Sequence, residues 1–154
     1  MAGELMRRLI PGDLATVVSR FEGASERSLF ALSTVFGYSR SELEVWLASP
    51  NCRLFVDAAS GLLVDVAEID REQAMARVQV CGTGEIEPVQ RLLAELQEGL
   101  MLDRLYSYVF PWESDEIGLL LDLGYVREAS FREHLYVRGG FQDIEVYGRA
   151  ATAP

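Results

Sequence analysis

The chain has 154 residues, of which 49% are hydrophobic, and a formal net charge of −10. This length and composition suit one folded domain with its own core and exclude a disordered chain. The charge leaves no basic surface to neutralise phosphates, so we do not expect nucleic-acid binding. All 14 basic residues are arginine, and the lack of lysine excludes Schiff-base chemistry and a phosphate-loop lysine.

The remaining composition points to a reducing cytoplasm. Cys52 and Cys81 are the only cysteines and His134 is the only histidine, which together do not make a zinc site. We expect two buried thiols and no metal. The first residues carry no long apolar run, and no stretch reaches the ~18 apolar residues of a membrane span, so neither a signal peptide nor a membrane segment is expected. The lysine-free composition also indicates GC-rich coding, as in some bacteria.

The N-terminal third predicts a short strand over Leu5–Leu9, followed by a helix over Leu14–Phe21. Pro11-Gly12-Asp13 separates the two, with Asp13 as N-cap. A further helix opens at Ser39 or Ser41. Its apolar face is made by Leu43, Trp46 and Leu47.

The middle of the chain predicts an antiparallel meander. Three strand-like segments, Cys52–Ala58, Leu62–Ile69 and Ala74–Cys81, are joined by short turns. Such short connections are typical of antiparallel neighbours.

A helix follows Gly82-Thr83-Gly84, with Pro88 in its first turn. Its apolar stripe comprises Val89, Leu92, Leu93, Leu96 and Leu100. The next strand is predicted over Leu105–Phe110. A strand-helix-strand connection implies a right-handed crossover and a parallel pair.

The C-terminal third predicts a short helix over Asp115–Leu123, ended by Gly124, and then a long hairpin turning at Gly139-Gly140. The strands of this hairpin are predicted over Tyr125–Glu128, Phe131–Arg138 and Phe141–Tyr147. Simple alternation puts Arg132, His134 and Tyr136 on one face. We expect a single domain over residues 1–148 and a flexible tail over 149–154.

This order of elements, with the segment Arg132-Glu133-His134-Leu135-Tyr136, resembles the C-terminal half of the GNAT superfamily of acyl-CoA-dependent N-acetyltransferases. The branch most similar is the one that acetylates protein N-termini, including ribosomal-protein N-terminal alanine, and antibiotic amines. The resemblance implies an α/β fold with a mixed sheet of six to seven strands and helices on both faces. It also implies a splay between strands four and five, in which acetyl-CoA or another acyl-CoA lies.

The resemblance assigns the cofactor to the end of the fourth strand. Pantetheine would bond to the strand near Gln79, Val80 and Cys81, and pyrophosphate would sit on the amides of Gly82-Thr83-Gly84. Glu113 stands where the family often has an asparagine that bonds pantetheine.

The same region departs from the family pattern. Glu85 and Glu87 place negative charge beside the phosphate turn, and Pro88 removes one N–H. Leu120 stands where the family has a tyrosine that protonates the departing thiolate, and leucine is no acid. A plain structural turn explains Gly82-Thr83-Gly84 about as well as a phosphate site does.

For catalysis, Glu68 is the candidate general base and Tyr136 a candidate group facing the cleft. Candidate substrate-binding residues are Trp46, Tyr108, Phe110 and Trp112. Each has a structural alternative, since most glutamates face solvent and aromatic residues at helical spacing are commonly core. Cys81 as a nucleophile has no base near it in the sequence.

Two functions stay open. The first is an N-acyltransferase acting on a small amine or a protein N-terminus, with a homodimer as a possible assembly. The second is a degenerate GNAT-like domain that does not use acetyl-CoA and binds another ligand, catalyses another reaction or serves as an interaction module. Fold alone does not decide between them.

Overall fold

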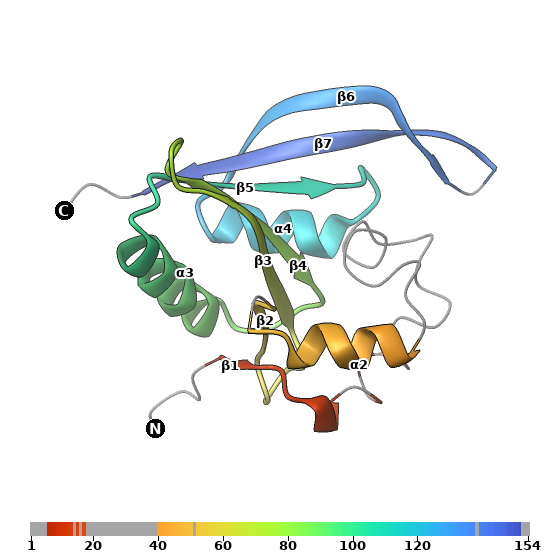
Figure 1. Ribbon diagram of the computed structural model, residues 1–154. Coiled ribbons are helices and arrows are strands. Elements are labelled where there is room, and N and C mark those ends of the chain that lie inside the picture. The colour runs from red at the N-terminus through yellow and green to blue at the C-terminus, as the bar shows by residue number, and fades with distance from the viewer. Residues whose placement is uncertain are drawn as a thin grey trace.

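The computed structural model describes residues 6–13, 15, 17, 40–50, 52–137 and 139–151. Within these ranges the chain forms one seven-stranded sheet with the order β1-β2-β3-β4-β5-β7-β6 (Figure 1). The strands are β1 (Arg7–Arg8), β2 (Leu54–Val56), β3 (Leu63–Asp70), β4 (Met75–Cys81), β5 (Arg104–Val109), β6 (Val126–Val137) and β7 (Gly140–Ala150). The helices are the 3-10 turn η1 (Pro11–Asp13), α2 (Arg40–Ala48), α3 (Ile86–Leu100) and α4 (Ser114–Asp122).

The sheet is mixed, with a single parallel pair among the described strands. β4 and β5 run parallel, joined through α3, whereas every other neighbouring pair is antiparallel. This confirms the predicted meander, the crossover and the α/β fold class.

β4 and β5 separate along their length. Ladder pairs join Met75 to Arg104, Ala76 to Leu105 and Arg77 to Tyr106, and the ladder between the two strands ends there. Both strands continue, to Cys81 and Val109 respectively. The predicted splay therefore opens from the Arg77–Tyr106 pair toward the C-terminal ends of the two strands.

The core lies between the sheet and the helices α3 and α4. Val78 and Val80 of β4 belong to one buried cluster with Leu93 of α3 and Leu120 of α4. Because side chains alternate along a strand, Arg77 and Gln79 point to the other face. Leu120, at the position where the family has an acidic tyrosine, is fully buried in this cluster and serves as a core residue.

The C-terminal hairpin corrects two predictions. β6 is one strand rather than two, with register shifts between Arg127 and Ala129 and between Phe131 and Leu135. Glu133 adopts a positive φ of 48°, and this bulge breaks the simple alternation. Phe131 and His134 consequently meet, with ring centroids 5.2 Å apart, although alternation placed them on opposite faces.

The predicted flexible tail begins too early. Arg149 and Ala150 belong to β7 and pair with Leu105 and Arg104 of β5. The Arg149 guanidinium also donates to the carbonyl of Leu123 at 2.9 Å. Strand pairing and this hydrogen bond hold residues 149 and 150 in the sheet. The predicted helix over 14–21 falls almost entirely outside the described residues.

Candidate functional site

Just beyond the last β4–β5 ladder pair, the side chain of Gln79 joins the two strands by hydrogen bonds. Gln79 is 1% exposed. Its Oε1 accepts from the Ser107 hydroxyl at 2.9 Å and from the Tyr108 N–H at 2.8 Å, and its Nε2 donates to the Tyr108 carbonyl at 2.9 Å. Gln79, predicted to contact a cofactor, thus links β4 to β5 with its own amide.

The Gly82-Thr83-Gly84 turn is held by internal contacts. Gly82 has φ of 104°, a conformation that favours glycine. Its N–H donates to Oε1 of Glu116 in the first turn of α4, at 3.2 Å. A Cβ at Gly84 would lie 2.6 Å from the hydroxyl of Ser60. Backbone conformation at one glycine and close packing at the other therefore explain both residues without a phosphate.

Val80 and Cys81, which precede the turn, are buried, whereas Thr83 within it is exposed. Cys81 forms no disulfide, and neither does the equally buried Cys52, as expected for two thiols. Burial raises the pKa of the Cys52 thiol above its ordinary value. Its thiolate, the nucleophilic form, is correspondingly disfavoured.

The end of β5 carries the predicted aromatic residues. Phe110 is fully buried, Tyr108 is half-buried, and Trp112 is 37% exposed and stacks on Phe110 with ring centroids 4.4 Å apart. Glu113 is buried, and its Oε2 accepts from the Phe110 N–H at 2.7 Å. Its carboxylate thus holds the turn between β5 and α4, which is a structural use for the residue at the family's asparagine position.

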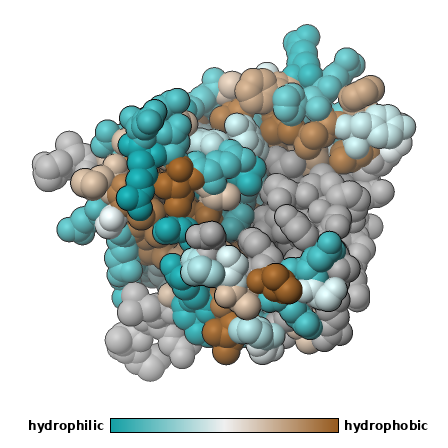
Figure 2. All heavy atoms as spheres, viewed as in Figure 1, coloured by the Kyte–Doolittle hydropathy of each residue, from teal (hydrophilic) through white to brown (hydrophobic). Residues whose placement is uncertain are grey.

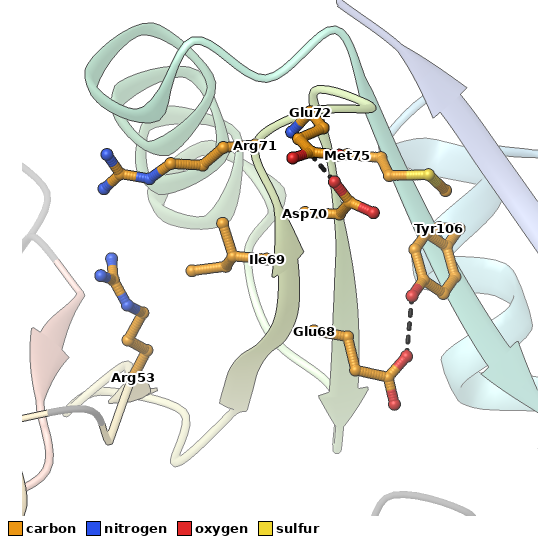
Figure 3. A pocket seen from close by; sticks show the side chains of 8 residues that line it. All are labelled: Arg53, Glu68, Ile69, Asp70, Arg71, Glu72, Met75 and Tyr106. Carbon is orange, nitrogen blue, oxygen red and sulfur yellow. Dashed lines mark hydrogen bonds between the residues drawn. The ribbon is translucent and has the colours of Figure 1, made fainter.

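Glu68 belongs to β3 and lies beside the paired N-terminal parts of β4 and β5. It occupies a bulge of β3, where its φ is 48°. Its Oε2 accepts from the Tyr106 hydroxyl at 2.7 Å (Figure 3), and its Oε1 lies 2.9 Å from Nη1 of Arg77. Burial, and then the Glu68 carboxylate, raise the pKa of Tyr106, so this hydroxyl is protonated at neutral pH and acts as a donor. Both oxygens of Glu68 are therefore oriented by neighbours, while about half of its side chain stays exposed.

An open cavity of about 730 Å³ adjoins this carboxylate. Figure 3 shows Glu68 and Tyr106 on one side of β3 and two arginines on the other. The cavity is lined by Arg53, Glu68, Ile69, Asp70, Arg71, Glu72, Met75 and Tyr106.

Tyr136 does not join this group. It is 65% exposed on β6 and packs edge-on against Phe141, with ring centroids 5.3 Å apart. Phe141 precedes Gly148, the β7 partner of Tyr106, by seven residues, about 23 Å at the usual strand rise. Of the predicted catalytic pair, only Glu68 borders the cavity. The side chain of Trp46, on α2, lies outside the described part, as does all of Tyr38.

Three residues of this region escaped sequence-based prediction: Tyr106, Arg77 and Glu116. Alternation from Gln79 and Tyr108 places Arg77 and Tyr106 on the same face as those residues, so that part of the signal was available. The bulge that turns Glu68 toward them has no sequence signature. Nothing in the sequence brings Glu116 to Gly82, because the contact spans the gap between β4 and α4.

Solved structures supply the decisive comparison, since no protein-family model and no curated protein matches this chain. A ribosomal-protein α-N-acetyltransferase in complex with coenzyme A superposes with a TM-score of 0.75 at 11% identity, covering 94% of this chain and 92% of that one. The chain has the GNAT fold. A spermidine N-acetyltransferase from Vibrio cholerae, in complex with CoA and spermine, gives 0.73 at 22% identity over 94% of each chain. A ribosomal-protein-S5-alanine acetyltransferase from Vibrio fischeri gives 0.69 at 17%, over 97% and 94%.

The GNAT fold raises the question of whether acyl-CoA fits these residues. The β4–β5 ladder ends at Arg77, so β4 beyond it is not paired with β5, which is what a pantetheine arm bonded to that strand requires. A pyrophosphate does not fit the Gly82 turn in this conformation, because the Glu116 carboxylate already accepts its N–H. The strand edge thus meets one requirement of a pantetheine arm, whereas the Glu116 carboxylate occupies the N–H that a pyrophosphate would need.

Two further features bear on partners. In the described ranges, no three His, Cys, Asp or Glu side chains are grouped to hold a metal, and no helix is long and apolar enough to cross a membrane. Figure 2 shows hydrophobic residues gathered at the upper right, over the β6–β7 hairpin. The exposed large hydrophobic residues of β6 and β7 include Val126, Phe131, Tyr136 and Phe141.

Proposed function

We propose that this chain is an N-acyltransferase that transfers an acyl group from an acyl thioester to the amine of a small molecule or a protein N-terminus. One observation carries the proposal. Arg77 and Tyr106, the last ladder pair before the splay, are also the two residues that hold the Glu68 carboxylate. A carboxylate is thereby held at the point where the two strands begin to part.

Glu68 would serve as the general base. An amine attacks a carbonyl only in its neutral form, so a proton must leave the nitrogen as the new C–N bond forms and the C–S bond breaks. The bound thioester supplies the activated carbonyl. Tyr106 and Arg77 each orient one oxygen of Glu68, and this preorganisation lowers the entropic cost of the proton transfer. No acid stands at Leu120, so the chain offers the leaving sulfur no proton from that position.

The proposed donor is acetyl-CoA or another acyl-CoA. Two observations support it: β4 is not paired with β5 beyond Arg77, and two proteins with this fold have CoA bound in their solved structures. The amine acceptors are proposed from the same relatives, one described as acting on a ribosomal protein and one on spermidine.

A second candidate is a GNAT-like domain that has lost acyl-CoA. The Glu116–Gly82 hydrogen bond favours it, since a carboxylate about 5 Å from a phosphate would repel it by ~1–3 kcal/mol at intermediate dielectric. Glu85 and Glu87 add negative charge nearby.

Calorimetry with acetyl-CoA and free CoA decides between the two candidates. We expect weak binding to the natural chain and at least a tenfold gain, ~1.4 kcal/mol, for Glu116→Gln, because the substitution removes a like charge beside the phosphate turn. Glu98→Gln, an exposed change near the other end of α3, is the matched control. No heat and no thermal shift at millimolar ligand, for either the natural chain or Glu116→Gln, would remove the acyl-CoA proposal.

Release of free thiol from acetyl-CoA in the presence of amines then tests the base. Glu68→Gln should lower kcat by about 10²–10⁴-fold, the usual effect of removing a positioned base. Glu72→Gln removes a carboxylate from the same cavity and should leave kcat within about twofold of the natural chain, as expected for an exposed substitution that removes no base. Equal rates for the two variants would exclude Glu68 from the chemistry.

A further inference from the structure

Two arginines converge on the side of the cavity away from Tyr106. Arg53 immediately precedes β2, and Arg71 is the first residue after β3. In Figure 3 their guanidinium groups lie on the same side of β3, with the side chain of Ile69 between them and the strand. Arg53 is half-buried and Arg71 exposed, so ligand can reach both. Two cations thus border one apolar side chain in a single cavity.

Neither guanidinium has a protein partner among the described residues. Two of the carboxylates that line the cavity are engaged elsewhere: Glu68 binds Arg77 and Tyr106, and Asp70 accepts the N–H groups of the two residues that follow Arg71, each at 3.0 Å. Acidic residues outnumber basic ones by 24 to 14 in the chain, so an unpaired arginine couple is not the expected outcome of chance. Guanidinium groups bind carboxylates with two parallel hydrogen bonds, which suits an anionic group of a ligand.

The cavity therefore has an anion-attracting side and a side with the Glu68 carboxylate. We propose that Arg53 and Arg71 form a carboxylate subsite, and that the acceptor is an amino-carboxylate whose amine lies at Glu68. This inference rests on the proposed function and names its substrate class. Ile69, beside the arginines, would contact the aliphatic part of the ligand.

A carboxylate fits better than a phosphate. Glu68, Asp70 and Glu72 also line the cavity, so a doubly charged phosphate would meet more repulsion than a singly charged carboxylate. The subsite is also remote from the phosphate turn. Arg71 precedes β4 and Gly82 follows it, which separates them by about 20 Å along the strand. An acyl donor in the splay therefore leaves the arginines available to the acceptor.

Calorimetry without any acyl donor tests the subsite. The ligands are β-alanine, 4-aminobutyrate, 5-aminopentanoate and 6-aminohexanoate, with putrescine, glutarate and inorganic phosphate as comparisons. One amino-carboxylate length should bind more tightly than putrescine or glutarate. Arg53→Gln and Arg71→Gln should each weaken that binding about tenfold, while Arg91→Gln, the same charge change on the exposed face of α3, should not.

Thermal melting of each variant verifies that it is folded, and Arg53→Lys, which keeps the charge but loses the two-pronged geometry, should give an intermediate affinity. Binding that is unchanged in both arginine variants would overturn the subsite. Tighter binding of phosphate, or of putrescine, would overturn its ligand class.

Thiol-release assays separate the subsite from the proposed function. Arginine-dependent binding without transfer to any amine would leave the subsite standing and refute acyl transfer. Transfer to putrescine as fast as to any amino-carboxylate, unaffected by Arg53→Gln and Arg71→Gln, would refute the subsite and leave acyl transfer standing.

Discussion

The two ends of β4 differ in where their polar groups are directed. At the N-terminal end, the strand borders an open cavity, and Glu68 and two arginines line its walls. At the C-terminal end, the polar groups of Gln79, Gly82 and Glu113 are each bonded within the protein. The N-terminal end therefore presents charged side chains to an open cavity, whereas the polar groups at the C-terminal end hydrogen-bond within the protein.

This difference separates the two halves of the proposed reaction. The Glu68 carboxylate and the cavity beside it are organised before any ligand arrives, which favours a chemical role for that end. At the donor end, a ligand has to replace hydrogen bonds that already exist, so part of its binding energy is lost. The three predictions that follow test whether the donor end is closed by its own structure.

The largest effect is expected at Gln79. Gln79→Ala removes three hydrogen bonds to β5 and leaves the buried Ser107 hydroxyl and the Tyr108 main chain without those partners, in addition to a cavity. We expect the free energy of unfolding to fall by about 2–4 kcal/mol, measured by urea denaturation.

Gln73→Ala, in the exposed β3–β4 turn, is the control and should change stability by less than about 0.5 kcal/mol. A Gln79 variant no less stable than this control would mean that the splay is not held by that amide.

The sequence predicts the order and pairing of the strands better than it predicts bulges and side-chain contacts. Short turns between apolar strands specify the meander, and the apolar stripe of the helix after Pro88 specifies the crossover, so the parallel β4–β5 pair follows. The bulge at Glu133 was not foreseen, because its stabilising contact comes from Asp143 on the neighbouring strand at 2.8 Å. Strand periodicity carries no information about such a contact.

The candidate site follows the same division. Glu68 was identified from its strand, but its two partners depend on a bulge and on the register of three strands. Tyr136 was proposed from a family resemblance in the hairpin, and the register of β6 and β7 puts it about 23 Å along the strand from Tyr106. Residue type and spacing predict which strand a group occupies, whereas register decides what it meets.

A second, smaller effect is expected at Gly84. Its missing Cβ leaves room for Ser60 and Leu62, whose nearest atoms would lie 2.6 Å and 3.3 Å from that carbon. Gly84→Ala should therefore lower the free energy of unfolding by about 1–2 kcal/mol, and Ser60→Gly in the same chain should recover part of the loss.

Gly99→Ala, within α3, is the matched control. Nothing lies within 4 Å of the Cβ it would add, so it should raise stability by about 0.5–1 kcal/mol through helix propensity. If Gly84→Ala leaves stability unchanged, packing does not explain this glycine, and close approach by a ligand becomes the better account.

The smallest effect is expected from the exposed carboxylates that flank the start of α3. Glu85→Gln with Glu87→Gln removes two negative charges beside the phosphate turn. CoA affinity should rise by about two- to fivefold, since two such exposed charges together contribute only ~0.4–1 kcal/mol. Stability should fall by about 0.3–1 kcal/mol, because acidic groups favour a helix N-terminus. The gain in affinity should shrink with added salt, which screens exposed charges.

Glu95→Gln with Glu98→Gln, farther along the same helix, keeps the net charge change but should alter neither affinity nor its salt dependence. Equal gains from both pairs would mean that net charge alone governs binding and that the phosphates do not lie at this turn.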